Sequence, residues 1–239
     1  MHIRVPNGSI IGPLLGLIYL NDLQYCFILK KILFADDSTV YLSDKNPHVL
    51  IKKLKTQLSM ISDWFISNRL SLHPKKTRYI FFYPPKCYIN VNPKIYIDGI
   101  LVERIGELSM EKSFKYVGVK IDENINFKEH VEHVHRKINK AMYCIRQQKR
   151  LLPLKTKLLL YNGLVKCHLD YCNIIWGYTS DSILKRLKIQ QKKTIRCIAG
   201  LEYNAHTHGM FCKLNVMKLE QITRYQTIMT AYRIFNSLA

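Results

Sequence analysis

Short apolar runs typical of strands fill most of the first half of the chain, and apolar residues at helical intervals fill the second half. Strand patterns occur at residues 31–34, 38–42, 79–83, 94–97, 100–102 and 114–121. Asp98-Gly99 separates two of these runs and predicts a two-residue hairpin turn. One amphipathic helix is expected among the strands, from the capping residue Asn46 to Phe65, with Pro47 at its first position.

In the second half, apolar residues recur at every third or fourth position, which predicts long helices. One stripe consists of Val131, Val134, Ile138, Met142 and Ile145. Further helices are expected at residues 154–169, 181–199 and 218–236. Asp181 and Gly200 would cap the second of these three. The chain is therefore predicted to be α+β, with an antiparallel sheet packed on helices in residues 1–124 and an all-α domain in residues 125–239.

The composition is that of a folded protein with a basic surface. The 239 residues are 48% apolar, and 37 Lys and Arg against 17 Asp and Glu give a net charge of +20. These cations run through nearly every segment, whereas a polybasic membrane anchor is usually one compact cluster. Nucleic acid is therefore favoured over an anionic membrane as the partner.

Neither export nor membrane insertion is expected. The apolar stretch from Ile10 to Leu20 is interrupted by Gly12, Pro13 and Gly16, and no small-residue cleavage site follows it, unlike in a signal peptide. No apolar run reaches the roughly 20 residues that a membrane span needs. Seven cysteines without the spacing of a disulfide framework suit reduced thiols inside a cell.

Two adjacent carboxylates, Asp36 and Asp37, stand between the first two strand runs and predict a hairpin with an acidic turn. Two like charges at a turn are unfavourable unless a cation lies beside them. Mg²⁺ suits this position, because it takes one or two protein carboxylates and completes its shell with water and substrate phosphates. Phosphoryl or nucleotidyl transfer is one hypothesis, and an ordinary Asp turn without a metal is the other.

Four motifs in order along the chain resemble those of reverse transcriptases, most closely those of non-LTR retrotransposons of the Jockey type. The motifs are Val5-Pro6-Asn7-Gly8-Ser9-Ile10-Ile11-Gly12-Pro13-Leu14-Leu15, Phe34-Ala35-Asp36-Asp37, Leu70-Ser71-Leu72-His73-Pro74-Lys75-Lys76-Thr77 and Tyr116-Val117-Gly118-Val119-Lys120-Ile121-Asp122. Residues 161–177 and 187–200 are similar to the region that follows the palm in these elements. The resemblance implies a partial polymerase palm in residues 1–124 and a thumb-like helical region in residues 125–239.

The resemblance implies that Asp36 and Asp37 are catalytic metal ligands in a two-metal nucleotidyl transfer with Mg²⁺. The substrates would be deoxynucleoside triphosphates, an RNA template and a DNA primer. Lys76 matches a lysine that neutralises or protonates the pyrophosphate leaving group, and Lys75 competes for this role.

Further nucleotide and template contacts are implied for the loop of Pro6, Asn7, Gly8 and Ser9, where a small side chain lets a nucleotide approach the backbone. Two residues depart from the family pattern. Asn7 stands where the family usually has Gln, and His73 stands where it often has Asn. The shorter amide of Asn7 puts its template contact in question.

Two more nucleic-acid contacts follow from the resemblance. Tyr116, Val117 and Gly118 match the primer grip, in which a tight glycine-containing turn supports the primer end. A core strand with one glycine is the alternative interpretation. The helix predicted at residues 181–199 looks like part of a thumb that holds phosphates without sequence specificity. Its cations are Lys185, Arg186, Lys188, Lys192, Lys193 and Arg196.

The polymerases that the chain resembles also need a further palm aspartate and the fingers, which would precede the first residue. We therefore expect no appreciable polymerase activity from this chain alone. The alternative function is a non-catalytic basic nucleic-acid-binding remnant, and a different Mg²⁺ phosphotransferase is disfavoured because no P-loop-like phosphate cradle is present. The resemblance also implies a nuclear setting.

Cysteine and histidine groups suggest zinc only weakly. The two groups are Cys167, His168 and Cys172, and Cys197, His206, His208 and Cys212. Neither matches the spacing of a common structural zinc site, and isolated cysteines often act as small apolar residues. The sequence contains no second acidic constellation with a nearby His, so an endonuclease is not expected.

Overall fold

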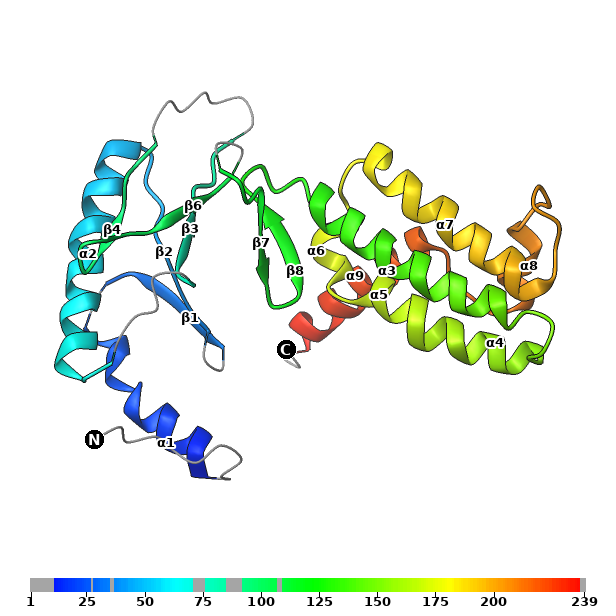
Figure 1. Ribbon diagram of the computed structural model, residues 1–239, viewed down its shortest axis with the longest axis horizontal. Helices are drawn as coiled ribbons and strands as arrows, with labels where there is room; N and C mark the ends of the chain where they lie inside the picture. Colours follow the sequence, from blue (N-terminus) through cyan, green and yellow to red (C-terminus); the bar gives the residue numbers. More distant parts are fainter. Residues whose placement is uncertain are drawn as a thin grey trace. The chain divides into compact units, whose positions relative to one another are not determined.

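The computed structural model describes residues 11–26, 28–34, 37–70, 76–84, 92–106 and 109–236. The chain divides into two compact units, Met1–Arg104 and Ile105–Ala239, each with its own apolar core (Figure 1). The predicted mixture of helices and short antiparallel strands is confirmed. The described strands, however, pair as four separate two-stranded sheets and not as one larger sheet.

The first unit combines two α-helices, a short 3₁₀ helix and strands that pair as β1–β2, β3–β6 and β4–β5. Its elements are α1 (Ile11–Tyr19), η1 (Asp22–Gln24), β1 (Lys30–Phe34), β2 (Asp37–Tyr41), α2 (Pro47–Ser67), β3 (Arg78–Ile80), β4 (Tyr96–Ile97), β5 (Ile100–Leu101) and β6 (Glu103–Ile105). The last strand ends at the border between the two units.

Both hairpins predicted in this unit are confirmed. β1 and β2 are antiparallel, and Phe34 pairs with Asp37, so the two connecting residues, 35 and 36, lie outside the described residues. β4 and β5 are joined by Asp98 and Gly99, whose φ angles of 52° and 73° are those of a type I′ turn. An Asp-Gly pair favours this turn because both positions need a positive φ.

The predicted helix beginning at Asn46 is confirmed as α2. The Asn46 Oδ1 accepts a hydrogen bond from the His48 N–H at 2.9 Å, and Pro47 opens the helix. The inner face of α2 buries Leu58, Ile61 and Trp64. These side chains belong to a core that also contains Leu23, Leu29, Ile95 and Val102.

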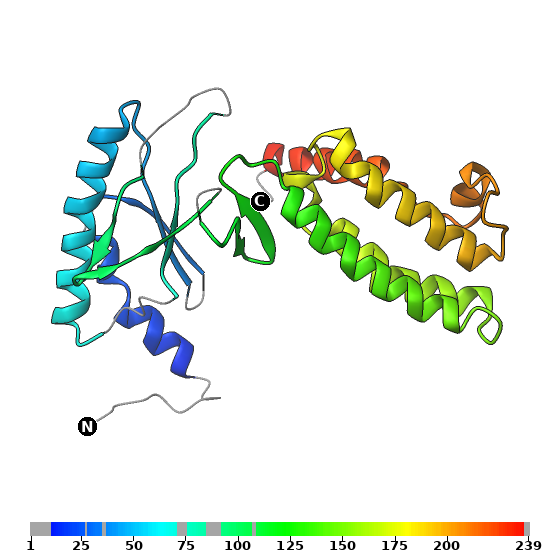
Figure 2. The same ribbon diagram turned by 45° about the horizontal axis from the view of Figure 1, so that its top comes forward.

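The second unit is a hairpin followed by helices. Its elements are β7 (Ser113–Tyr116), β8 (Val119–Asp122), α3 (Lys128–Gln147), α4 (Leu154–Tyr161), the π-helical η2 (Asn162–Lys166), α5 (Cys167–Asp170), α6 (Asn173–Trp176), α7 (Asp181–Ala199), α8 (His208–Lys213) and α9 (Leu219–Phe235). α3 lies alongside both α4 and α7 (Figure 2). The predicted stripe on α3 is confirmed, because Val131, Val134, Ile138 and Ile145 are buried.

A buried glutamine joins three helices of this unit. The Gln191 Nε2 donates hydrogen bonds to the Tyr161 Oη and to the Met217 carbonyl, each at 2.9 Å, and the Gln191 Oε1 accepts one from the Leu219 N–H at 3.0 Å. Burial raises the pKa of Tyr161 to about 12, so this phenol stays protonated in the core. The network connects α4, α7 and the start of α9.

The single strand predicted for residues 114–121 is wrong. Val117 and Gly118 have φ angles of 41° and 84° and reverse the chain, so β7 and β8 form a hairpin in which Tyr116 pairs with Val119. Glycine tolerates the left-handed conformation that this turn requires.

The expected cap at Asp181 is also wrong. Ser180 is the N-cap residue of α7, and Asp181 is the first helical residue, whose carboxylate accepts a hydrogen bond from the Lys188 Nζ at 2.8 Å. A carboxylate in the first helical turn is favourable in either position because it complements the helix dipole. At the other end Gly200 terminates α7 with a φ of 70°, as predicted.

A tight loop connects β8 to α3. The Asp122 carboxylate accepts hydrogen bonds from the N–H groups of Asn124, Asn126 and Phe127 at 3.2, 3.1 and 2.8 Å. Because the hairpin is held to α3 in this way, it belongs to the same compact unit as the helices. The division between units thus falls at Arg104 and Ile105, earlier than the change from strands to helices. None of the helices in the described part has the length and apolar character to cross a bilayer.

Candidate active-site hairpin and nucleic-acid interface

The acidic end of the β1–β2 hairpin is the first candidate site. Asp37 is the first residue of β2, lies opposite Phe34, and is exposed to solvent. Asp36 lies outside the described residues. An exposed carboxylate at a strand end is a hard oxygen donor of the kind that Mg²⁺ prefers, and the donor chemistry of the hairpin therefore suits this ion.

The other predicted residues of the catalytic region are only partly described. Lys76 is exposed and lies two residues before β3. In the described part of the chain, Lys76 has no hydrogen bond or ion pair with Asp37. Lys75 and the loop of Pro6, Asn7, Gly8 and Ser9 lie outside the described residues.

No metal cluster is found in the part of the chain that the structure describes: no three His, Cys, Asp or Glu residues there are grouped so that they could hold an ion. Both Cys and His groups considered for zinc lie within this part. The exposed Cys167 donates a hydrogen bond through its Sγ to the Gly163 carbonyl at 2.8 Å, one turn earlier.

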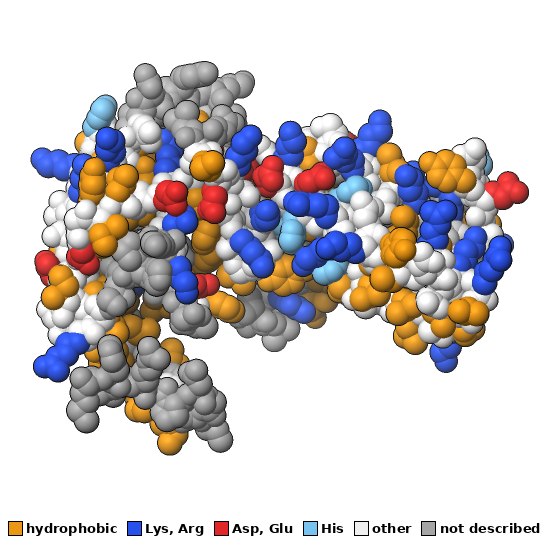
Figure 3. Space-filling model, in the orientation of Figure 1, with side chains coloured by type: hydrophobic (Ala, Val, Ile, Leu, Met, Phe, Trp, Pro, Cys, Tyr) orange, Lys and Arg blue, Asp and Glu red, His pale blue; other side chains and the backbone are white. Residues whose placement is uncertain are grey.

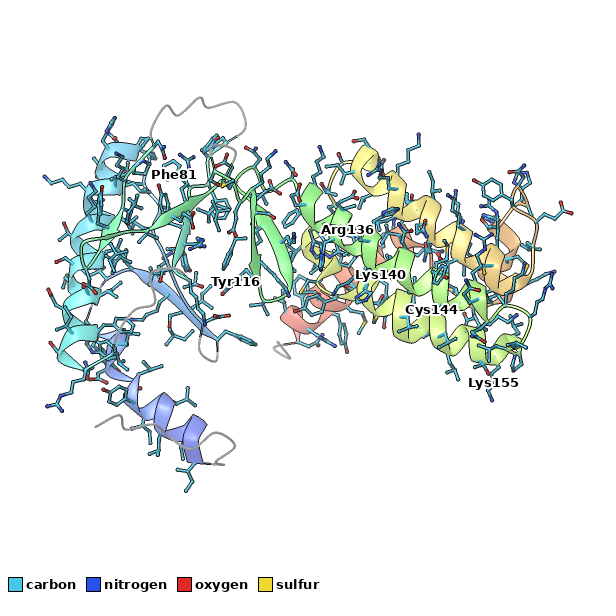
Figure 4. All side chains as sticks on the ribbon, in the orientation of Figure 1. Phe81, Tyr116, Arg136, Lys140, Cys144 and Lys155 are labelled. Carbon is cyan, nitrogen blue, oxygen red and sulfur yellow. The ribbon has the colours of Figure 1, made fainter. Side chains whose placement is uncertain are left out.

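The second candidate site is the turn of the β7–β8 hairpin. The Tyr171 Oη donates a hydrogen bond to the Val117 carbonyl at 2.6 Å. A Cβ atom on Gly118 would lie 3.0 Å from the Tyr171 ring. The Tyr171 ring therefore fixes the turn that contains Val117 and Gly118, and Tyr116 lies at the end of the adjoining strand (Figure 4). The sequence analysis missed Tyr171 because it lies 54 residues beyond Val117 and belongs to none of the four motifs.

A buried histidine attaches this hairpin to α3. The His130 Nδ1 accepts a hydrogen bond from the Lys120 N–H at 3.2 Å, and the His130 ring lies 5.4 Å from the Trp176 ring. Burial, followed by the charges of His133, Lys137 and Lys120, lowers the pKa of His130 to about 4. His130 is therefore neutral at pH 7.

The six basic residues predicted as phosphate contacts on α7 differ in their surroundings. Arg186 forms an ion pair with Glu132 at 2.9 Å, and Lys188 forms ion pairs with Asp181 at 2.8 Å and Glu220 at 2.6 Å. The hydrogen bonds that Lys188 donates to the carboxylates of Asp181 and Glu220 raise the pKa of Lys188.

The remaining four divide into two pairs. The Arg196 Nε donates a hydrogen bond to the Ala205 carbonyl at 2.8 Å, and the Lys193 Nζ lies 5.9 Å from the centre of the Tyr203 ring. Lys185 and Lys192 are exposed and form no ion pair with any described residue. These last two are the α7 cations most available to an external phosphate.

Comparison with known families identifies the first half of the chain. Residues 2–121 match the model of the family described as reverse transcriptase (RNA-dependent DNA polymerase). The match includes the β1–β2 hairpin and the β7–β8 turn. No solved structure matches the chain significantly.

Three curated relatives extend the similarity over most of the chain. A probable RNA-directed DNA polymerase from transposon X-element of Drosophila melanogaster is 26% identical over 207 residues, which cover 83% of this chain and 22% of the relative. A probable RNA-directed DNA polymerase from transposon BS of the same species is 25% identical, covering 94% of this chain and 25% of the relative. The RNA-directed DNA polymerase from mobile element jockey of Drosophila funebris is 24% identical, and the match covers 90% of this chain and 24% of the relative.

The chain thus spans about a quarter of the length of the relatives it matches. The family match covers three of the four motifs that carried the resemblance and all but the last residue of the fourth, and the relatives named for RNA-directed DNA polymerases align beyond it into the helical unit. The chain belongs to the reverse transcriptase family and represents the reverse transcriptase region of a non-LTR retrotransposon.

Proposed function

We propose that this chain forms part of the nucleotidyl-transfer centre of an RNA-directed DNA polymerase, in which the end of the β1–β2 hairpin binds Mg²⁺. The observation that carries the proposal is the register of this hairpin, in which β1 ends at Phe34 and β2 begins opposite it at Asp37, within the residues that match the family. The substrates in this proposal are an RNA template, a DNA primer and deoxynucleoside triphosphates.

In this proposal Asp36 and Asp37 would hold the metal at the end of the hairpin. Two Mg²⁺ ions, when bound, would activate the attacking primer hydroxyl and stabilise the leaving pyrophosphate. Lys76, or alternatively Lys75, would neutralise or protonate the pyrophosphate leaving group. The proposal also assigns a nucleotide contact to Gly8 and Ser9, because residues with small side chains allow close approach to the backbone.

The helical unit would hold the template–primer duplex. The proposal assigns residues 1–124 to a partial palm and residues 125–239 to a thumb-like region, with the hairpin turn of Tyr116, Val117 and Gly118 at the primer end. The exposed Lys185 and Lys192 support a phosphate contact along α7, because neither has an internal ion-pair partner among the described residues. In keeping with this role, we propose that the protein acts in the nucleus.

A non-catalytic nucleic-acid-binding role is the second candidate, and the net charge of +20 favours it. Binding of this kind depends on the release of counterions, and it therefore falls steeply with salt and needs no Mg²⁺. The two functions are separated by whether nucleotides are incorporated.

Primer extension on an RNA template with Mg²⁺ tests the proposed function. Any incorporation that the chain supports should require Asp36 and fall by about 100-fold or more in Asp36→Asn, because a carboxylate that holds the metal is lost. The matched control is Asp63→Asn, which removes an exposed carboxylate from α2 and should leave incorporation unchanged. Incorporation that survives in Asp36→Asn would contradict the metal-binding role. Absence of incorporation in all three proteins, with salt-sensitive binding retained, would favour the second candidate.

A further inference from the structure

The β7–β8 hairpin places two lysines directly opposite each other. Lys115 on β7 is the cross-strand partner of Lys120 on β8, and the two side chains therefore emerge on the same face of the hairpin. Like charges at such a pair of positions destabilise a hairpin. Hairpin stability therefore does not explain why lysines occupy both positions.

The outer surface of α3 carries three more cations next to this hairpin. Arg136 and Lys140 are one turn apart on α3 (Figure 4), and Lys137, which follows Arg136 in the sequence, is exposed like both of them. Like charges at this spacing destabilise an isolated helix. From residue 133 to residue 169 the sequence contains nine Lys and Arg residues and no Asp or Glu.

The two hairpin lysines and two of the α3 cations, Arg136 and Lys137, act on the same residue, His133. Burial, followed by the charges of Lys137, Lys120, Arg136 and Lys115 in that order, lowers the pKa of His133. The hydrogen bond from the Lys120 N–H to His130 holds β8 against the same helix. In Figure 3, Lys and Arg side chains surround histidines on the face of the second unit over β8 and α3.

In the described part of the chain, no carboxylate neutralises the positive charge of these cations. Within the part of the chain that the structure describes, none of Lys115, Lys120, Arg136, Lys137 and Lys140 takes part in an ion pair. Two nearby acidic residues have other partners, since Glu132 pairs with Arg186 and the Asp122 carboxylate accepts the N–H groups of its loop. Departures from local stability rules without a compensating contact are typical of functional sites.

We propose that Lys115, Lys120, Arg136, Lys137 and Lys140, the hairpin–α3 cluster, bind the sugar-phosphate backbone of an RNA–DNA duplex. The inference rests on the proposed function for its nucleic-acid partner, and it assigns the main phosphate contact of the helical unit to this cluster, with α7 contributing less. Phosphates between the hairpin and α3 relieve both like-charge repulsions at once. Four of the six α7 cations, in contrast, already have partners within the protein.

Fluorescence anisotropy with a labelled RNA–DNA duplex, across salt from about 50 to about 300 mM, tests the cluster. The variants are Lys115→Gln/Lys120→Gln and Arg136→Gln/Lys140→Gln. The matched control is Arg150→Gln/Lys155→Gln, which removes the same charge from exposed positions in the α3–α4 turn and at the start of α4. Thermal unfolding of each variant verifies that it is folded.

We expect each cluster variant to bind about tenfold or more weakly than the wild type near 0.1 M salt and to reduce the salt slope by about two. The control should remain within about threefold of the wild type, because its cations are not part of the site. An equal loss in the control, or unchanged binding in the cluster variants, would overturn the inference while leaving the proposed function intact.

Two other outcomes distinguish a failure of the proposed function from a failure of the inference alone. If the wild-type chain does not bind the duplex even at the lowest salt, the nucleic-acid part of the proposed function fails together with the inference. If the cluster variants keep duplex binding but lose binding to vesicles with anionic headgroups, the cluster is a membrane surface, and the inference is wrong.

Discussion

Asp122 and His130 secure the junction between β8 and α3 by different means. The Asp122 carboxylate accepts three backbone N–H groups of the connecting loop, and the His130 ring accepts one N–H group from β8. Neither role follows from hydrophobic periodicity, since one residue is an acid at a strand end and the other a polar residue on the inner face of a helix. In both cases the partner is a backbone group, and the sequence does not encode its position locally.

Asp122→Ala should destabilise the second unit by about 2–3 kcal/mol, because three buried or half-buried N–H groups lose their acceptor. Urea denaturation followed by circular dichroism measures this loss. Asp122→Asn, which keeps one oxygen acceptor, should cost less than the alanine variant. An alanine variant as stable as the wild type would show that water replaces the carboxylate at no cost.

His130 should make the second unit sensitive to acid. Its pKa is lowered from 6.5 to about 4 in the folded protein, so the unfolded chain binds a proton more readily than the folded chain. The stabilisation is complete above pH 6.5 and declines as the pH falls to about 4, by up to roughly 3 kcal/mol. Unfolding free energies measured between pH 4 and pH 8 test this dependence.

The comparison for this pH series is His130→Asn, whose Oδ1 can accept the Lys120 N–H in place of Nδ1. Between pH 4 and 6.5, the free energy of unfolding of this variant should lack the pH dependence that arises from uptake of one proton. His206→Gln, at an exposed position, should keep the wild-type dependence. An unchanged pH profile in His130→Asn would contradict the assignment to His130.

At the scale of secondary-structure elements, α2, α3 and the body of α7 are where the sequence predicts them, because apolar periodicity and terminal residues such as Asn46 and Gly200 act locally. Apolar periodicity did not predict the β7–β8 hairpin, and only the resemblance to the primer grip implied a glycine-containing turn there. A glycine inside a strand pattern is compatible with a bulge, a close approach or a turn. The choice depends on Tyr171, a residue distant in sequence whose hydroxyl reaches the Val117 carbonyl.

Gly118→Ala should destabilise this hairpin by about 1–3 kcal/mol. The φ angle of 84° is unfavourable for alanine, and its Cβ would lie 3.0 Å from the Tyr171 ring. Thermal unfolding measures the change, with Gly209→Ala in α8 as the control. A Cβ at Gly209 has open space and helical backbone, so that variant should be neutral or slightly stabilised. Equal behaviour of the two variants would contradict a strained turn at Gly118.

At the scale of the whole molecule, the charge is unevenly distributed between the two units. Residues 105–239 contain 23 Lys and Arg against 10 Asp and Glu, so most of the positive charge lies on the helical unit. The sequence predicts this excess and the nucleic-acid partner that it favours. The sequence does not predict which cations are available, because ion pairs such as Arg186 with Glu132 join residues 54 positions apart.

The family and the acidic hairpin were predictable because they depend on short motifs in a fixed order. The arrangement of the predicted site was not, because residues as far apart in the sequence as Asp37 and Lys76 can be brought together only by tertiary packing, which local patterns do not encode. Metal binding at the end of the β1–β2 hairpin is the central claim that an experiment must test.

The most direct test is manganese-induced broadening of backbone amide NMR signals, with an RNA–DNA template–primer present and Mn²⁺ as the paramagnetic probe for Mg²⁺. We predict broadening centred on residues 30–41, lost in Asp36→Asn/Asp37→Asn and retained in Asp63→Asn. Broadening centred elsewhere, or unchanged in the double variant, would show that the hairpin does not bind the metal and would contradict the proposed polymerase site.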